Sequence, residues 1–144
     1  MKTVLSYAPS EQQFIPVPPL GIAVLSAYLK ERGISVDTMD LELELWLSQN
    51  GLSSTLAQKS INEITFNQEV NIQAVVALLL PYNIVSFSLM GKRQLQYVKH
   101  IIEELKNQSS EFVAAIIGGS LLSDENVEDI AQQLSVDYAI VGEG

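Results

Sequence analysis

The residues of this chain that could bind a ligand are glycines and serines that follow short apolar runs. Three such segments cover residues 88–91, 118–120 and 142–144, and an earlier run leads into Pro9 and Ser10. Glycine lets a backbone approach a ligand closely or adopt a positive φ. Backbone amides and hydroxyl groups at these positions are suited to holding a ligand. We therefore expect a binding site, and we assign no catalytic residue.

Metal and thiolate chemistry is largely excluded by composition. The chain has no cysteine, which removes disulfides, thiolate nucleophiles, zinc–thiolate sites and iron–sulfur ligation. Its single histidine, His100, falls on the predicted polar face of a helix, so we expect a solvated side chain. A site built from several histidines cannot form within one chain, and no metal-ligating residue is expected.

Charge and hydropathy limit the partners. The chain of 144 residues has a net charge of −9, with 4 basic and 8 acidic residues in 1–72 and 4 and 9 in 73–144. No basic patch is available for a phosphate backbone, so no nucleic-acid partner is expected. No apolar stretch approaches the roughly 18 residues of a membrane span, and no secretory leader is recognised. We expect no membrane partner and a cytoplasmic location.

Apolar runs and helical periodicities alternate along the sequence. Strands are expected at residues 2–8, 34–40, 84–89, 112–117 and 137–141. Helices are expected at about 20–32 and 69–80. A third helix is expected from an apolar face formed by Leu95, Val98, Ile101, Ile102 and Leu105. A fourth is expected after the candidate cap Ser123, with a core face of Val127, Ile130, Ala131 and Leu134. Residues 41–47 fit a strand and a helix equally well, and Trp46 with its leucines indicates a core or docking stripe.

This order predicts one α/β domain over residues 1–144. We expect a three-layer Rossmann-like, flavodoxin-like fold with a five-stranded parallel sheet in the order 2-1-3-4-5 and a helical insertion at about 41–81. The strand order reverses between strands one and three, and ligands bind at such switch points in open parallel sheets. The loop at residues 8–20 would then face residues 88–91.

Familiar ligands of this architecture do not match the sequence. A G-x-G-x-x-G turn, a nucleotide P-loop, the paired acids of a phosphoacceptor and the phosphate loop of a flavin site are all missing after the first strand. The predicted crevice is lined by backbone amides, serines and apolar side chains with little charge. Such a lining is typical of a site for a large and mostly neutral ligand.

Four motifs, taken in order, resemble a known family. They are V-P-P-L-G-I-A-V-L-S-A-Y-L-K-E-R-G at 17–33, V-D-T-M-D at 36–40, I-G-G-S at 117–120 and D-Y-A-I-V-G-E-G at 137–144. Together they resemble the N-terminal cobalamin (vitamin B12)-binding domain of class B radical S-adenosylmethionine (radical SAM) enzymes. The resemblance spans the chain apart from the insertion, and its order and spacing make it specific.

The resemblance implies a module that binds a corrinoid and positions it beside a radical SAM barrel. That barrel, with its [4Fe–4S] cluster and S-adenosylmethionine, would lie downstream in the same polypeptide and is absent from this chain, so the fragment alone is not expected to be an enzyme. The expected cofactor contacts are Pro9, Ser10, Leu20, Gly21, Ser88, Leu89, Met90, Gly91, Gly118, Gly119, Ser120, Gly142 and Glu143.

Alternatives stay open at several of these positions. The glycines at 118–119 also suit an ordinary strand–helix turn, the prolines before Gly21 suit a helix start, and Gly142 and Glu143 could simply lead into a next domain. The loop after the first strand has no histidine to act as an axial cobalt ligand. A domain that has lost cobalamin and serves docking or substrate recognition is the alternative function.

Overall fold

The computed structural model describes residues 1–11, 19–52, 64 and 69–142. Five parallel strands form one sheet in the order β2-β1-β3-β4-β5, which confirms the predicted order. The strands are β1 Thr3–Tyr7, β2 Asp37–Asp40, β3 Ile84–Ser88, β4 Ala114–Gly118 and β5 Tyr138–Ala139. The helices are α1 Leu20–Glu31, α2 Leu41–Gln49, α3 Ile72–Leu79, α4 Arg93–Gln108 and α5 Val127–Leu134.

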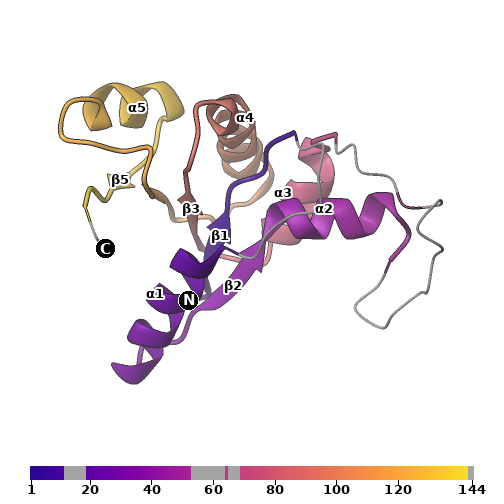
Figure 1. Ribbon diagram of the computed structural model, residues 1–144, viewed down its shortest axis with the longest axis horizontal. Coiled ribbons are helices and arrows are strands. Elements are labelled where there is room, and N and C mark those ends of the chain that lie inside the picture. The colour runs from indigo at the N-terminus through magenta and orange to yellow at the C-terminus, as the bar shows by residue number, and fades with distance from the viewer. Residues whose placement is uncertain (12–18, 53–63, 65–68, 143–144) are drawn as a thin grey trace.

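Two cores of different size lie on the two faces of the sheet. On one face, buried side chains of β1, β3 and β4 pack against α2, α3, α4 and α5. On the other face, α1 packs through Ile22 against Leu5 and Val36. Figure 1 shows α1 by itself on its side of the sheet, away from α3, α4 and α5. These three layers are the Rossmann-like arrangement predicted from the sequence.

The pleat of the central strands explains why one face is so much more apolar. Val85 and Phe87 of β3 are almost fully buried, as is Ile117 of β4, and all three belong to the larger core. The residues between them point to the other face because side chains alternate along a strand. On that face β3 presents Ser86 and Ser88 toward its carboxyl end, and the smaller core lies beside them around Leu5 of β1.

The insertion after β2 contains two described helices. Residues 41–47, which fit a strand and a helix equally well, form α2, and Asp40 caps it by accepting a hydrogen bond from the Leu43 amide at 3.0 Å. Asn71 caps α3 in the same way through the Ala74 amide at 3.1 Å. Trp46 is 7% exposed and belongs to the interior. Short polar side chains at both starts therefore determine where these helices begin.

Element boundaries differ modestly from the predictions. The strand expected from Ile34 begins at Asp37, the one expected from Phe112 begins at Ala114, and β5 is only two residues long. The predicted cap at Ser123 is wrong. Helix α5 begins at Val127 after Asn126, whose side chain does not cap it. The Asn126 side chain instead turns back toward the preceding loop. Its Oδ1 accepts a hydrogen bond from the backbone amide of Ser123, and its Nδ2 donates to the Leu121 carbonyl.

Two smaller expectations concern His100 and the membrane. His100 is exposed on α4, as expected for a solvated residue. Among the helices in the described part of the chain, none is long and apolar enough to cross a bilayer.

Candidate functional site

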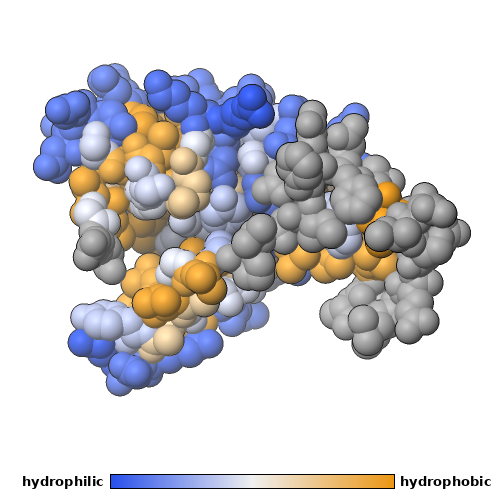
Figure 2. Space-filling view, in the orientation of Figure 1, coloured by the Kyte–Doolittle hydropathy of each residue, from blue (hydrophilic) through white to orange (hydrophobic). Residues whose placement is uncertain are grey.

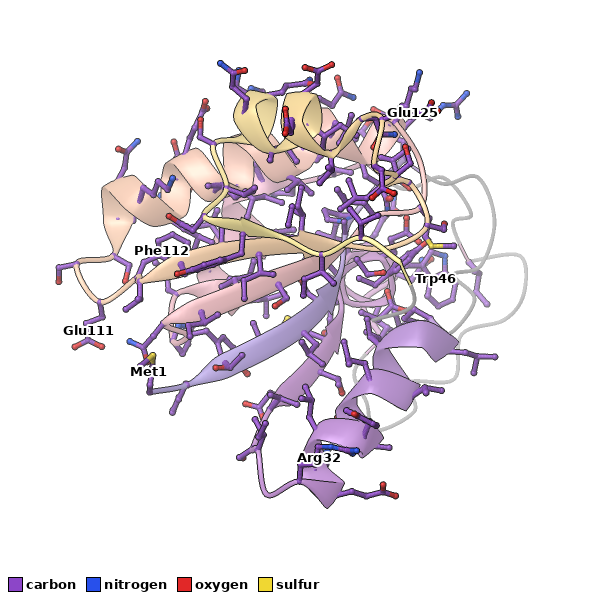
Figure 3. All side chains as sticks on the ribbon, turned by 90° about the vertical axis from the view of Figure 1, so that its left-hand side faces the viewer. Met1, Arg32, Trp46, Glu111, Phe112 and Glu125 are labelled. Carbon is purple, nitrogen blue, oxygen red and sulfur yellow. The ribbon has the colours of Figure 1, made fainter. Side chains whose placement is uncertain are left out.

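The ends of the central strands lie in register along one edge of the sheet. Tyr7 of β1 pairs with Ser88 of β3, and Ser88 pairs with Gly118 of β4. Because all strands are parallel, the loops that follow them leave from this same edge. Figure 3 shows the edge from the side, with Trp46 of α2 near it and with Met1 and Phe112 near the opposite edge. The segments singled out in the sequence after β1, β3 and β4 therefore start from one rim.

Gln94 joins the loops that follow β1 and β3. Its side chain is 3% exposed, and its Nε2 donates to the Ala8 carbonyl at 2.7 Å. Its Oε1 accepts from the amides of Met90 at 2.7 Å and Gly91 at 3.1 Å. One glutamine therefore uses both ends of its amide to hold the two loops at the switch point. Gln94 was not selected from the sequence, because it lies among polar residues at the start of an amphipathic helix.

Glu42 is a second polar side chain buried at this edge. It is 2% exposed, and its Oε1 accepts a hydrogen bond from the Ser10 hydroxyl at 2.5 Å. Burial, reinforced by the nearby charge of Asp40, raises the pKa of Glu42 to about 7 although the Ser10 hydrogen bond acts in the opposite direction. Burial also raises the pKa of Asp40 itself. A carboxyl group that is half protonated near neutral pH thus lies beside the loop after β1.

These residues surround a cavity of about 460 Å³ at the switch point between β1 and β3. Its lining consists of Tyr7, Ser10, Glu11, Glu42, Met90, Gly91, Lys92, Arg93 and Gln94. Three of them, Ser10, Met90 and Gly91, were expected to contact the cofactor. The cavity carries two carboxyl groups and two cationic side chains, so the expectation of a nearly uncharged lining is wrong for this part of the rim. The charges come from Glu11 in the loop after β1, from Glu42 of α2 and from Lys92 and Arg93 at the start of α4.

Gly119 is required by the packing of the chain itself. Its φ is +107°, and a Cβ at this position would lie 2.4 Å from the Leu89 carbonyl oxygen. The Leu89 side chain is fully buried; its amide donates to the Gly118 carbonyl at 2.7 Å, and its own carbonyl accepts from the Leu121 amide at 3.1 Å. The close approach that Gly119 permits is therefore made by the loop after β3. Contacts of Leu89 and Gly119 with a cofactor stay predictions.

Other predicted contacts remain accessible around this edge. A Cβ added at Gly91 or Gly21 would meet nothing within 4 Å, and one at Gly118 would make only ordinary contacts at 3.8 Å or more. Ser120 is exposed and donates from its hydroxyl to the Met90 sulfur at 3.2 Å. These residues have room for a ligand, and their contacts with a cofactor stay predictions.

The remaining predicted contacts are more scattered. Pro9 is buried after β1, Leu20 is 75% exposed at the start of α1, and Gly142 is exposed with φ of +93°. None of these three lines the cavity described above. Glu143 lies outside the described residues.

A hollow flanked by apolar surface lies between α1 and β5 (Figure 2). On the helix side Leu20 and Val24 are exposed, and after β5 Ile140 is 48% exposed. Because side chains alternate along a strand, Ser86, Ser88 and Gly118 share one face of the sheet. At its carboxyl end this face of β3 and β4 combines the small residues Ser88 and Gly118, and their contacts with a ligand stay predictions.

No family model matches the sequence, and no curated protein matches it. Among solved structures, the chain is similar to a cobalamin-binding protein from Desulfitobacterium hafniense DCB-2, with a TM-score of 0.59 and 12% sequence identity. The match covers 99% of this chain and 53% of that chain, so this chain spans about half the length of the protein it matches. At this level of identity, the likeness shows that the two share a fold.

Proposed function

We propose that this domain binds a corrinoid at the edge where its strands end. The observation that carries the proposal is the alignment of Ser88 and Gly118 on one rim, in a fold shared with a cobalamin-binding protein. Small residues in register leave space for a bulky planar ligand to approach the sheet. The rim also lies at the reversal of strand order, where open parallel sheets bind their ligands.

The residues present fit such a ligand in three respects. Gly91 and Gly118 leave room above the strand ends. The hollow between α1 and β5 offers apolar surface for the uncharged parts of the molecule. The cavity beside Gln94 offers polar groups for the carboxamide side chains at the corrin periphery, and its volume of about 460 Å³ suits one edge of the ligand rather than the whole. Bound cobalamin would supply organometallic cobalt chemistry, while this chain would bind and orient it.

We further propose that the corrinoid is positioned for a radical SAM barrel of the same polypeptide. The support is the paired motifs at 17–33 and 137–144, which resemble class B radical SAM enzymes. The [4Fe–4S] cluster and S-adenosylmethionine would belong to that barrel, because this chain has no cysteine to hold a cluster. Methyl transfer or modification of a peptide or natural product is the reaction class, and a cytoplasmic location belongs to the same proposal.

A titration of the full chain with hydroxocobalamin at pH 6.5, followed by visible spectroscopy and gel filtration, tests corrinoid binding. We expect the corrin to comigrate with the protein. The substitutions Gly118→Leu and Gly91→Leu should weaken binding at least tenfold, because the added side chains occupy open space at the rim. The matched control is Ser110→Leu, an exposed residue in the turn before β4, which should bind like the unmodified protein.

The outcome that overturns the proposal is a folded protein that does not retain the corrin at any concentration tested. Gly119 is unsuitable as a probe because its substitution would disturb the packing on Leu89 whether or not a ligand binds. Unchanged binding by both leucine variants would place the ligand away from this rim.

The second candidate is a docking domain without cobalamin. It is favoured by the exposed apolar stripe of α1, where Leu20, Val24 and Tyr28 are 75%, 69% and 51% exposed. Spacings of four residues place the three side chains on one side of the helix. Two results together would support this alternative. The folded protein would not bind hydroxocobalamin, and Val24→Glu would abolish its binding to a radical SAM barrel.

A further inference from the structure

The buried carboxyl of Glu42 has no role in the hydrophobic packing of its helix. Its neighbours Leu41, Leu45 and Trp46 form the apolar side of α2 that packs in the interior. Glu42 instead lines the cavity at the switch point, together with Ser10 from the loop after β1 and Gln94 from α4. Burying an ionisable group is unfavourable unless it is neutral or well paired. Its presence on a cavity wall therefore points to a group that contacts what enters the cavity.

We infer that Glu42 recognises a carboxamide group at the edge of the bound corrinoid by donating a hydrogen bond from its protonated carboxyl to the amide carbonyl oxygen. This inference rests on the proposed function, since it names a hydrogen bond by which the same site would bind the corrinoid. Ser10, which donates to the Glu42 Oε1, holds the carboxyl group in place against the loop.

The charges around the cavity favour a neutral polar group over an ion. With Glu42 protonated, the carboxylate of Glu11 lines it together with the cationic Lys92 and Arg93, so charges of both signs are present. An anion would meet the Glu11 carboxylate, and a cation would meet the two basic side chains. A carboxamide avoids both penalties and still accepts a hydrogen bond.

The protonation state of Glu42 is set by groups from each element around it. Asp40 at the end of β2 adds a like charge, and Ser10 donates a hydrogen bond that favours ionisation. Tyr7 of β1 and Glu11 line the same cavity, as do Lys92 and Arg93 before and within α4. Burial outweighs the Ser10 hydrogen bond and brings the pKa of Glu42 to about 7. The donor form therefore dominates below neutral pH and is lost above it.

The inference is tested by measuring the dissociation constant of cyanocobalamin between pH 6 and pH 8. This probe is chosen because its cyanide ligand keeps the cobalt coordination constant over that range. If only the protonated carboxyl binds, the dissociation constant of the unmodified protein rises about tenfold from pH 6 to pH 8. Glu42→Gln retains a neutral hydrogen-bonding side chain and should abolish this dependence. Glu44→Gln, an exposed residue on the same helix, should keep it.

A second measurement needs no variant. Carbon-13 NMR of the glutamate carboxyl groups should show the pKa of Glu42 rising when cyanocobalamin is added, because a ligand that binds the protonated form stabilises it. Binding with the same affinity at pH 6 and pH 8, or a pKa of Glu42 that falls on binding, overturns the inference and leaves corrinoid binding intact. Absence of binding at every pH overturns the proposed function, and the inference with it.

Discussion

Replacing Glu42 with glutamine should make the protein more stable at alkaline pH and change little at acidic pH. In the unfolded chain the pKa of a glutamate is 4.5, and in the folded protein burial raises the pKa of Glu42 to about 7. Between these values the folded state holds a proton that the unfolded state has released, so stability falls as pH rises. The loss is fully developed only above the pKa of the folded state.

The size of the effect follows from the same two values. At 1.36 kcal/mol per pH unit, their difference corresponds to about 3 kcal/mol. Most of this, about 2–3 kcal/mol, should be lost between pH 5 and pH 8. Screening by solvent should be small, because the side chain is only 2% exposed.

Urea unfolding of the unmodified protein and of Glu42→Gln at pH 5, 6, 7 and 8 measures this effect. The difference in unfolding free energy between the two proteins should grow by about 2–3 kcal/mol in favour of the variant over that range. Glu44→Gln is the control, since the exposed Glu44 on the same helix should give a nearly constant difference. A difference for Glu42→Gln that does not change with pH would refute the argument that burial keeps this carboxyl protonated.

Two further substitutions test the fold that positions the site. Gly119→Ala should destabilise the protein by about 3 kcal/mol, because its Cβ would overlap the Leu89 carbonyl at a positive φ. Gly91→Ala, where a Cβ meets nothing within 4 Å, should be nearly neutral, and equal urea midpoints for the two would contradict this account. Asn71→Ala should lower the unfolding free energy by about 1 kcal/mol through loss of the α3 cap. Asn71→Asp preserves the acceptor and should restore stability, so an alanine variant as stable as the aspartate variant would show that the cap contributes nothing.

The strand order could be predicted from the sequence because alternating apolar runs and helices, with right-handed crossovers, allow few arrangements. The runs ending at Tyr7 and Ser88 lie as neighbours for this reason. Residues 41–47 were ambiguous because leucines at every second position also place leucines at helical spacing. The choice of helix depends on the Asp40 cap and on packing that Leu41 and Leu45 make with distant parts of the chain.

The polar residues of the cavity could not be found in the same way. Glu42 and Gln94 occupy positions that a sequence pattern assigns to solvent, and their burial arises only when the loops after β1 and β3 come together. Gly119 illustrates the opposite case. The sequence indicated a close approach of a ligand at this glycine, whereas the group that approaches it in the structure is the Leu89 backbone.

Helix α1 is attached to the sheet much more weakly than the helices on the other face. Among the residues that the structure describes, its core contains three buried side chains, Leu5, Ile22 and Val36, whereas the opposite core contains twenty. Elements with little buried apolar area open first in native-state hydrogen exchange. The amide protons of α1 should therefore exchange by local opening at a free energy well below that of global unfolding, so the width of the hollow beside it can adjust without unfolding the sheet.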